Sequence, residues 1–226
     1  MAGVREIGRV DTGSTESKPL RAKRGPWKLF YAWTMTIIAA GHDAMIAERK
    51  RALLGGLHGT VVEVGPGTGP NLAYYPPDVR WIGVEPNGHM NGFLEKEARR
   101  LGRTIELHGG TVEALPFAGN SVDHVVSTLV FCSVDDQARA LREVWRVLKP
   151  GGRFVFIEHV AAAEGTRLLR LQNVIAPAWR LVADGCRPDR RTWEAISGAG
   201  FSAVEIERFH VSAGPFGPHI AGYAVK

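Results

Sequence analysis

A glycine-rich loop and one acidic residue are the parts of this chain best suited to chemistry. The loop runs Gly65-x-Gly67-x-Gly69 after an apolar segment, and Glu85 ends the next apolar segment, twenty positions after Gly65. Glycine lets a backbone turn tightly and approach a ligand without a Cβ in the way. A carboxylate at the end of the following strand can accept hydrogen bonds from both ribose hydroxyls of a nucleoside. The glycines alone would fit a tight turn equally well, but the loop and Glu85 together favour a nucleoside site.

The same loop excludes two common phosphate sites. It is not the dinucleotide pattern G-x-G-x-x-G, because Pro70 stands where the third glycine belongs. It is not a P-loop either, because no Gly-Lys-Ser/Thr follows. A loop whose backbone can approach the ligand closely, with no lysine to bind a phosphate, therefore suits a nucleoside that carries no phosphate.

Alternating strand and helix patterns place this loop in an α/β fold. Strands are predicted over residues 60–64, 80–84, 104–107, 122–128, 153–157, 203–210 and 220–225. Helices are predicted over residues 27–40, 43–57, 90–101, 136–148, 166–182 and 191–199, with a further helix start after the glycine loop. Pro177 should interrupt its helix, and Lys149-Pro150-Gly151-Gly152 should close the one before it. We expect a mostly parallel sheet with helices on both faces and an antiparallel hairpin at one edge.

Length and composition predict one globular unit. The 226 residues suffice for a single sizeable domain, divided here into a flexible basic leader (1–25), an N-terminal helical cap (26–57) and the main domain (58–226). The apolar stretch 27–40 is shorter than the roughly 20 residues that span a bilayer, so we expect no stable membrane insertion.

Charge and cysteine content narrow the partners further. The net charge is +5, but no stripe of Lys and Arg is interleaved with aromatic residues, so we expect no nucleic-acid partner. The two cysteines, Cys132 and Cys186, show no metal-ligand spacing, so we expect neither a metal site nor a disulfide framework. Such cysteines favour a reducing, cytoplasmic location.

Five segments together resemble the class I S-adenosylmethionine-dependent methyltransferases: 61–69 (VVEVGPGTG), 83–87 (GVEPN), 113–117 (EALPF), 121–123 (SVD) and 141–152 (LREVWRVLKPGG). The resemblance covers about residues 43–226. It implies a Rossmann-like fold with a seven-stranded sheet, in which the final β-rich segments supply one antiparallel strand. It also implies S-adenosyl-L-methionine as the cofactor.

The resemblance also assigns cofactor contacts by position. Glu63 and residues 65–69 would hold the methionine end of the cofactor, and Glu85 would hold the ribose. The residues near the adenine would be Pro86, Asn87 and Met90, and residues 128–129 would complete the pocket wall. Many relatives carry an Asp where this chain has Gly110-Thr111-Val112, so only the Val112 backbone remains to meet the adenine there. The implied cofactor-binding residues are Glu63, Val64, Gly65, Pro66, Gly67, Gly69, Glu85, Pro86, Asn87, Met90, Val112, Glu113, Thr128 and Leu129.

Later segments resemble a narrower group, the alkyl-thiol methyltransferases of the methyltransferase-like proteins. These segments are residues 128–134, 158–162, 177–179, 184–186 and 218–226. The implied acceptor is a small thiol. Alternatives are O-, N- or C-methylation of a small apolar metabolite such as a quinone, and a non-catalytic protein that only binds the cofactor. The thiol methyltransferases carry an N-terminal membrane anchor, which we do not expect in this chain.

Three residues are candidates for catalysis. His159, where the fifth strand ends, is either a base or orienting group for the acceptor or a histidine hydrogen-bonded at a strand end. Asp184 either orients a partner or caps the next segment, and His219 faces either the pocket or solvent. Cys186 is expected to be a small buried residue rather than a nucleophile.

Overall fold

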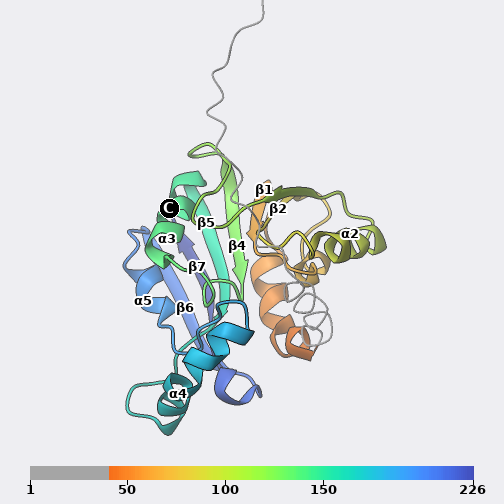
Figure 1. Ribbon diagram of the computed structural model, residues 1–226. Coiled ribbons are helices and arrows are strands. Elements are labelled where there is room, and N and C mark those ends of the chain that lie inside the picture. Colours follow the sequence, from red (N-terminus) through yellow and green to blue (C-terminus); the bar gives the residue numbers. More distant parts are fainter. Residues whose placement is uncertain (1–40) are drawn as a thin grey trace, which may run out of the picture.

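The computed structural model describes residues 41–226 and arranges seven strands in one sheet (Figure 1). The order across the sheet is β3-β2-β1-β4-β5-β7-β6. β7 pairs antiparallel with both β5 and β6, whereas the pairs among β1 to β5 are parallel. The bounds are β1 (Thr60–Val64), β2 (Arg80–Glu85), β3 (Glu106–Gly109), β4 (Val122–Thr128), β5 (Leu148–His159), β6 (Ala203–His210) and β7 (Pro218–Val225). The predicted sheet with one antiparallel strand is confirmed.

Helices cover both faces of this sheet, as predicted (Figure 1). One core includes buried residues of α3 and α5, and the other includes residues of the helix over 41–54, of η1 and of α2. The helices are residues 41–54, α2 (Asn91–Arg100), α3 (Gln137–Val147), α4 (Arg167–Val182) and α5 (Thr192–Ser197), with 3₁₀ turns η1 (Pro70–Ala73) and η2 (Gly214–Phe216).

α3 shows how local sequence and packing agree. The Asp136 side chain accepts a hydrogen bond from the backbone N–H of Arg139 at 2.9 Å, which caps the first turn. Leu141, Val144 and Val147 recur at helical spacing on one face and are buried against the sheet. Burying each such side chain contributes about 1.5–3 kcal/mol.

The predicted end of the helix before residues 149–152 is confirmed, but these residues already belong to β5. Within β5, Gly151 takes φ 76° and its N–H bonds to the Lys226 carbonyl at 3.1 Å. The predicted interruption at Pro177 was wrong. Pro177 lies inside α4 without ending it. A proline removes one backbone hydrogen bond. The buried Gln172 side chain joins α4 to the segment after β5, since it accepts from the Ala162 N–H at 2.7 Å.

The remaining elements agree with the predicted ends to within three residues, apart from the helix start after the glycine loop. That segment forms only the single 3₁₀ turn η1, because Pro76-Pro77 follows and disfavours a continued helix. The predicted leader and the predicted helix over 27–40 lie outside the described residues.

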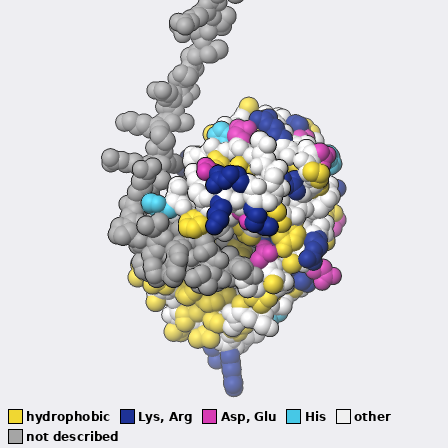
Figure 2. All heavy atoms as spheres, turned by 90° about the vertical axis from the view of Figure 1, so that its right-hand side faces the viewer, with side chains coloured by type: hydrophobic (Ala, Val, Ile, Leu, Met, Phe, Trp, Pro, Cys, Tyr) yellow, Lys and Arg dark blue, Asp and Glu magenta, His cyan; other side chains and the backbone are white. Residues whose placement is uncertain are grey.

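One face of α4 is apolar and exposed. Leu171, Val174, Leu181 and Val182 are all exposed on this helix. Figure 2 shows hydrophobic side chains gathered towards the lower end of the molecule, the level at which Figure 1 places α4. Among residues 41–226, no helix is both long enough and apolar enough to cross a bilayer.

Candidate active site

The glycine loop turns between β1 and η1 at the carboxyl end of the sheet. The Gly65 N–H donates to the Val84 carbonyl at 2.8 Å, which joins the loop to β2. Gly67 has φ 57°, and a Cβ placed there would meet no atom of residues 41–226 within 4 Å. By contrast, a Cβ at Gly69 would lie 2.5 Å from Leu94 of α2. The loop therefore presents open space at Gly67 and packs against the protein at Gly69.

Glu85 lies beside that open space. β1 and β2 run parallel with Val64 opposite Val84, so the end of β2 comes next to the loop. The Glu85 carboxylate accepts the Gly67 N–H at 3.0 Å and the Asn87 N–H at 2.8 Å, and the residue is buried. The Glu85 carboxylate is therefore held beside the open space at Gly67. A hydrogen-bond-accepting carboxylate in this position fits the ribose hydroxyls of a nucleoside cofactor.

Glu63 lies below the loop rather than beside the open space. Its carboxylate is fully buried and accepts hydrogen bonds from Asn71 at 2.8 Å, Tyr75 at 2.8 Å and Trp81 at 2.9 Å. Burial raises the pKa of Glu63, and the three donors oppose that rise. Asn71 also donates to Thr128 Oγ1 at 3.0 Å, which ties this network to the end of β4.

The residues after β2 form a compact turn into α2. Asn87 and Met90 are buried, whereas Pro86 is exposed. The Met90 N–H donates to the Asn87 carbonyl at 2.8 Å, which closes the turn. On the other side of the sheet edge, Val112 is buried and Glu113 accepts from the Asp135 N–H at 3.2 Å.

A buried carboxylate that sequence reasoning missed shapes the turn after β4. Glu158 of β5 accepts from Ser127 Oγ at 2.6 Å, from the Val130 N–H at 3.2 Å and from the Phe131 N–H at 3.1 Å. Burial raises its pKa, and these donors oppose the rise. Within that turn Leu129 takes the left-handed φ 60°. An acidic residue inside the apolar run of β5 was the signal that could have indicated Glu158.

His159, the last residue of β5, meets two cysteines from distant segments. Its Nε2 lies 3.1 Å from Cys186 Sγ, and Trp179 Nε1–H donates to the same sulfur at 3.3 Å. Ligand atoms of Cys132, His159 and Cys186 all lie within 4.8 Å of one another. Cys186 is half-buried as a residue, while its sulfur belongs to this buried group. The sequence did not reveal the cluster, because 27 residues separate each of these positions from the next.

The charges in this cluster depend on one another. The hydrogen bond from Cys132 is the largest effect on Cys186 and lowers its pKa to about 5, although burial acts the other way. The same contact, together with burial, raises the pKa of Cys132 well above its ordinary value. Burial alone would lower the pKa of His159, but its contacts with Cys186 raise it. A Cys186 thiolate facing a protonated His159 is the arrangement these shifts favour.

His219 is buried, so of the two alternatives it does not face solvent. Its Nδ1 lies 2.9 Å from the Gly217 carbonyl, an atom that can only accept, so Nδ1 carries the proton. Nε2 must then accept from His42 Nε2–H, 3.1 Å away. Burial lowers the pKa of His219 to about 4, so it is neutral at pH 7. Its ring centroid lies 6.2 Å from that of His159.

Asp184 lies in the turn that follows α4, directly after the C-cap Ala183. It is half-buried and takes the left-handed φ 49°. The structure therefore brings Asp184 into the segment that delivers Cys186, two residues further on.

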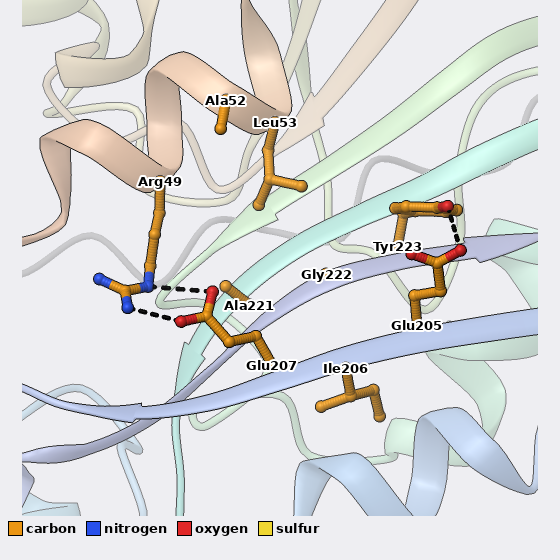
Figure 3. A pocket seen from close by; sticks show the side chains of 9 residues that line it. All are labelled: Arg49, Ala52, Leu53, Glu205, Ile206, Glu207, Ala221, Gly222 and Tyr223. Carbon is orange, nitrogen blue, oxygen red and sulfur yellow. Dashed lines mark hydrogen bonds and ion pairs between the residues drawn. The ribbon is translucent and has the colours of Figure 1, made fainter.

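A separate hollow of about 470 Å³ lies between the helix over 41–54 and the β6–β7 hairpin (Figure 3). Arg49 bridges it by pairing with Glu207 at 2.6 Å, and Tyr223 donates to Glu205 on its other side. None of the predicted site residues lines this hollow. It has no part in the site described above.

Comparison with known proteins agrees with this geometry. The family described as a methyltransferase domain matches residues 62–156. The chain is 40% identical to human thiol S-methyltransferase TMT1A over 218 residues, which cover 88% of this chain and 86% of that protein. It is 30% identical to the Escherichia coli ubiquinone/menaquinone biosynthesis C-methyltransferase UbiE over 183 residues, or 71% of this chain and 72% of that protein. The fold is similar to that of a Streptomyces coelicolor geranyl diphosphate C-methyltransferase, with a TM-score of 0.62 and 16% identity over 79% of this chain and 75% of that one.

Proposed function

Since the chain belongs to the S-adenosylmethionine-dependent methyltransferases, we propose that it methylates the sulfur of a small thiol. The observation that carries this proposal is the 40% identity to a thiol S-methyltransferase over almost nine-tenths of both chains. Identity at this level extends well beyond residues 62–156, where the general methyltransferase family matches. It therefore includes the segments after β5.

We propose that the loop and the turn after β2 bind the cofactor. Gly67 offers open space beside its backbone, and the Glu85 carboxylate lies within hydrogen-bond distance of the Gly67 N–H. Glu63 supports this loop from below through Asn71 and Tyr75. The cofactor set proposed is the one assigned from the sequence: Glu63, Val64, Gly65, Pro66, Gly67, Gly69, Glu85, Pro86, Asn87, Met90, Val112, Glu113, Thr128 and Leu129.

When bound, the cofactor supplies an electrophilic methyl group on a positively charged sulfur. The protein then mainly has to align the acceptor, and alignment alone contributes about 7–11 kcal/mol in well-oriented reactions. A thiol with a pKa near 8.5 is a few per cent thiolate at neutral pH and is already a strong nucleophile. His159 lies at the end of β5 beside the ring of Phe216 and is proposed to face the acceptor sulfur. We propose that two further residues position His159 and the segment around Cys186. They are the neutral, buried His219 and Asp184, which lies in the turn before Cys186.

The helix over 41–54 supports a capping role for residues 26–57. Its His42 reaches His219 of β7, and its Ile46 packs with Ile157 of β5. We propose that this segment covers the acceptor side of the main domain, which spans residues 58–226. Both cysteines are unpaired thiols, which supports a reducing compartment such as the cytoplasm.

A quinone or similar ring carbon is the second candidate acceptor. It is favoured by the 30% identity to the C-methyltransferase UbiE over about seven-tenths of this chain. The two acceptors demand different chemistry, because a ring carbon must lose a proton after the methyl group arrives whereas a thiolate needs no further step.

The test is a panel of acceptors incubated with the full-length protein and methyl-labelled cofactor. Alkyl thiols, phenols, amines and a reduced quinone are compared, and mass spectrometry locates the transferred methyl group. We expect labelled thioethers from apolar thiols. Label on a ring carbon, with none on any thiol, would replace the thiol proposal with the quinone one. Gly67→Ala serves as the control for methylation that does not depend on the bound cofactor.

A further inference from the structure

Three side chains at the acceptor end of the sheet form a set of metal-ligand atoms. Cys132 comes from the turn after β4, His159 ends β5, and Cys186 comes from the turn after α4. One ligand atom from each lies within 4.8 Å of the other two. His159 is the residue proposed above to face the acceptor, so the cluster lies on the proposed acceptor side of the site.

The backbone holds these segments together without help from a metal. The Arg187 N–H, next to Cys186, donates to the Cys132 carbonyl at 3.1 Å. The Cys186 N–H donates to Ala183 at 3.0 Å, which tightens the turn. Gly185 takes φ 89°, and a Cβ there would lie 3.4 Å from the Ser133 carbonyl. The close approach of the two cysteine-bearing turns is therefore built into the chain.

The donor set and spacing suit zinc. Zinc binds thiolate sulfur at about 2.3 Å and imidazole nitrogen at about 2.0–2.1 Å in tetrahedral geometry, which places neighbouring ligand atoms roughly 3.4–3.8 Å apart. His159 Nε2 lies 3.1 Å from Cys186 Sγ, and the ligand atoms of all three residues lie within 4.8 Å of one another. The spacings that zinc requires fall between these two values. Side-chain movements of about an ångström would bring the three ligand atoms to these spacings.

The set stops at three ligands in the part of the chain that the structure describes. The nearby Glu158 carboxylate is occupied by hydrogen bonds from Ser127, Val130 and Phe131. His159 Nδ1 is buried and has no hydrogen-bond partner among the described residues. Three protein ligands with one open position are typical of catalytic rather than structural zinc sites.

We propose that Cys132, His159 and Cys186 bind one zinc ion, whose fourth position takes the acceptor thiol as a thiolate. This proposal rests on the proposed thiol methylation. The thiol loses its proton to solvent on binding, and a sulfur lone pair forms the new bond to the methyl carbon while the bond from that carbon to the cofactor sulfur breaks. Thiolate and sulfonium charges cancel, so a neutral thioether and S-adenosylhomocysteine result without any oxidant. In this arrangement His159 holds the metal and does not itself remove the proton.

The expectation of no metal site, drawn from sequence spacing, is thereby revised. That expectation used ligand separation along the chain, whereas the three segments meet only through β4, β5 and the turn after α4. A thioether binds zinc less strongly than a thiolate, because soft anionic sulfur is the preferred ligand. The thioether product should therefore leave the zinc ion after each methyl transfer.

The experiment begins with full-length protein purified without chelator and analysed for metal by mass spectrometry. We expect about one zinc per chain, removed by a strong chelator and restored by added zinc. Thiol methylation should fall at least 10-fold on removal and recover on addition, while calorimetric affinity for S-adenosylhomocysteine stays unchanged. Cobalt(II) added to the stripped protein should give the thiolate-to-cobalt absorption bands of a tetrahedral site.

Variants assign the ligands. Cys132→Ser, Cys186→Ser and His159→Gln should each lower zinc content and abolish the cobalt bands, whereas His108→Gln, an exposed histidine far from the cluster, should change neither. Stripped wild-type protein that stays folded but takes up no zinc or cobalt overturns the proposal, as does a Cys132–Cys186 disulfide in protein kept under reducing conditions. Zinc bound through these residues with no effect of its removal on methylation overturns the catalytic role. Zinc bound while no thiol is methylated by any preparation leaves the metal site standing and refutes the thiol acceptor.

Discussion

The cofactor half and the acceptor half of the site are built in different ways. Most of the proposed cofactor half lies within residues 63–90, on two adjacent parallel strands and the turns that follow them, and four further positions (Val112, Glu113, Thr128 and Leu129) come from later turns. The acceptor half is assembled from the turns after β4, β5 and α4 and from the start of β7, which are far apart along the chain. A site supplied by one supersecondary unit can be read from local sequence, whereas one assembled by tertiary folding cannot.

The two halves also differ in how their charged groups are stabilised. Glu63 and Glu85 accept hydrogen bonds from neutral donors: the side chains of Asn71, Tyr75 and Trp81 for the first, and backbone N–H groups for the second. In the acceptor half, Cys132, Cys186 and His159 shift one another's pKa. Substitutions among Cys132, Cys186 and His159 should therefore be non-additive, whereas Glu63 and Glu85, which share no hydrogen-bond donor, should act independently of each other.

The largest expected effect is on the cofactor half. Gly67→Ala should weaken S-adenosylhomocysteine binding by at least 100-fold, because the new Cβ would enter the open space beside the loop. Calorimetry measures the affinity. Gly102→Ala is the matched control, since Gly102 has φ 63° and no atom near its Cβ position but lies after α2. It imposes similar backbone strain and should leave affinity unchanged. Equal losses in the two variants would mean that strain, not ligand contact, explains the effect.

Glu85 should show the next largest effect. Glu85→Gln should weaken S-adenosylhomocysteine binding by about 10- to 100-fold, the scale of 1.5–3 kcal/mol for hydrogen bonds to a charged group. Glu95→Gln, on the exposed side of α2, is the control and should bind normally. If Glu85→Gln bound the cofactor like wild type, the carboxylate would serve only to hold the loop through Gly67 and Asn87.

The cofactor half was predictable because each of its signals was local. The loop, Glu85 and the strands on either side were predicted from glycine spacing and apolar runs, and the structure places them together. The network below the loop was not predictable. Asn71, Tyr75 and Trp81 carry no pattern of their own. Asn71 and Tyr75 meet Glu63 only when η1 and the residues after it fold back over β1, and Trp81 meets it from the neighbouring strand β2.

The acceptor half shows more clearly how little of a site assembled by tertiary folding can be predicted from sequence. His159 and His219 were candidates because they lie at strand ends, but Cys132 and Cys186 were treated as unrelated cysteines. Their proximity depends on the left-handed residues Asp184 and Gly185, which turn the chain back after α4. Pro177 was misjudged because the helix α4 continues through it, which shows that a local breaker signal does not by itself decide where a helix ends.

Tyr75→Phe tests the network below the loop through stability and pH. Removing the donor to Glu63 should cost about 1–3 kcal/mol of unfolding free energy at pH 8. Burial raises the pKa of Glu63 in the folded state, so the stability linked to this group is present below its unfolded pKa and is lost as pH rises through the folded value. Tyr75 favours the charged form, so its loss should matter less near pH 5, where Glu63 is more protonated. Urea unfolding at both pH values measures this, and an equal cost at both would mean that Glu63 stays in one protonation state.

The smallest expected effect is in the acceptor half, where Trp179→Phe removes one donor and keeps an aromatic ring. Trp179 Nε1–H donates to Cys186 Sγ at 3.3 Å, and its ring packs 4.4 Å from that of Phe216. Phenylalanine can keep the ring contact, so the loss reduces to one hydrogen bond, about 0.5–1 kcal/mol. We expect kcat/KM for an apolar thiol to fall about 3-fold with S-adenosylhomocysteine affinity unchanged.

Trp145→Phe, on the exposed side of α3, is the matched control and should change neither quantity. A loss of cofactor affinity in Trp179→Phe would contradict the separation of the two halves, because Trp179 would then act on the loop across the sheet. An unchanged rate with every thiol would instead mean that the sulfur of Cys186 needs no donor from α4.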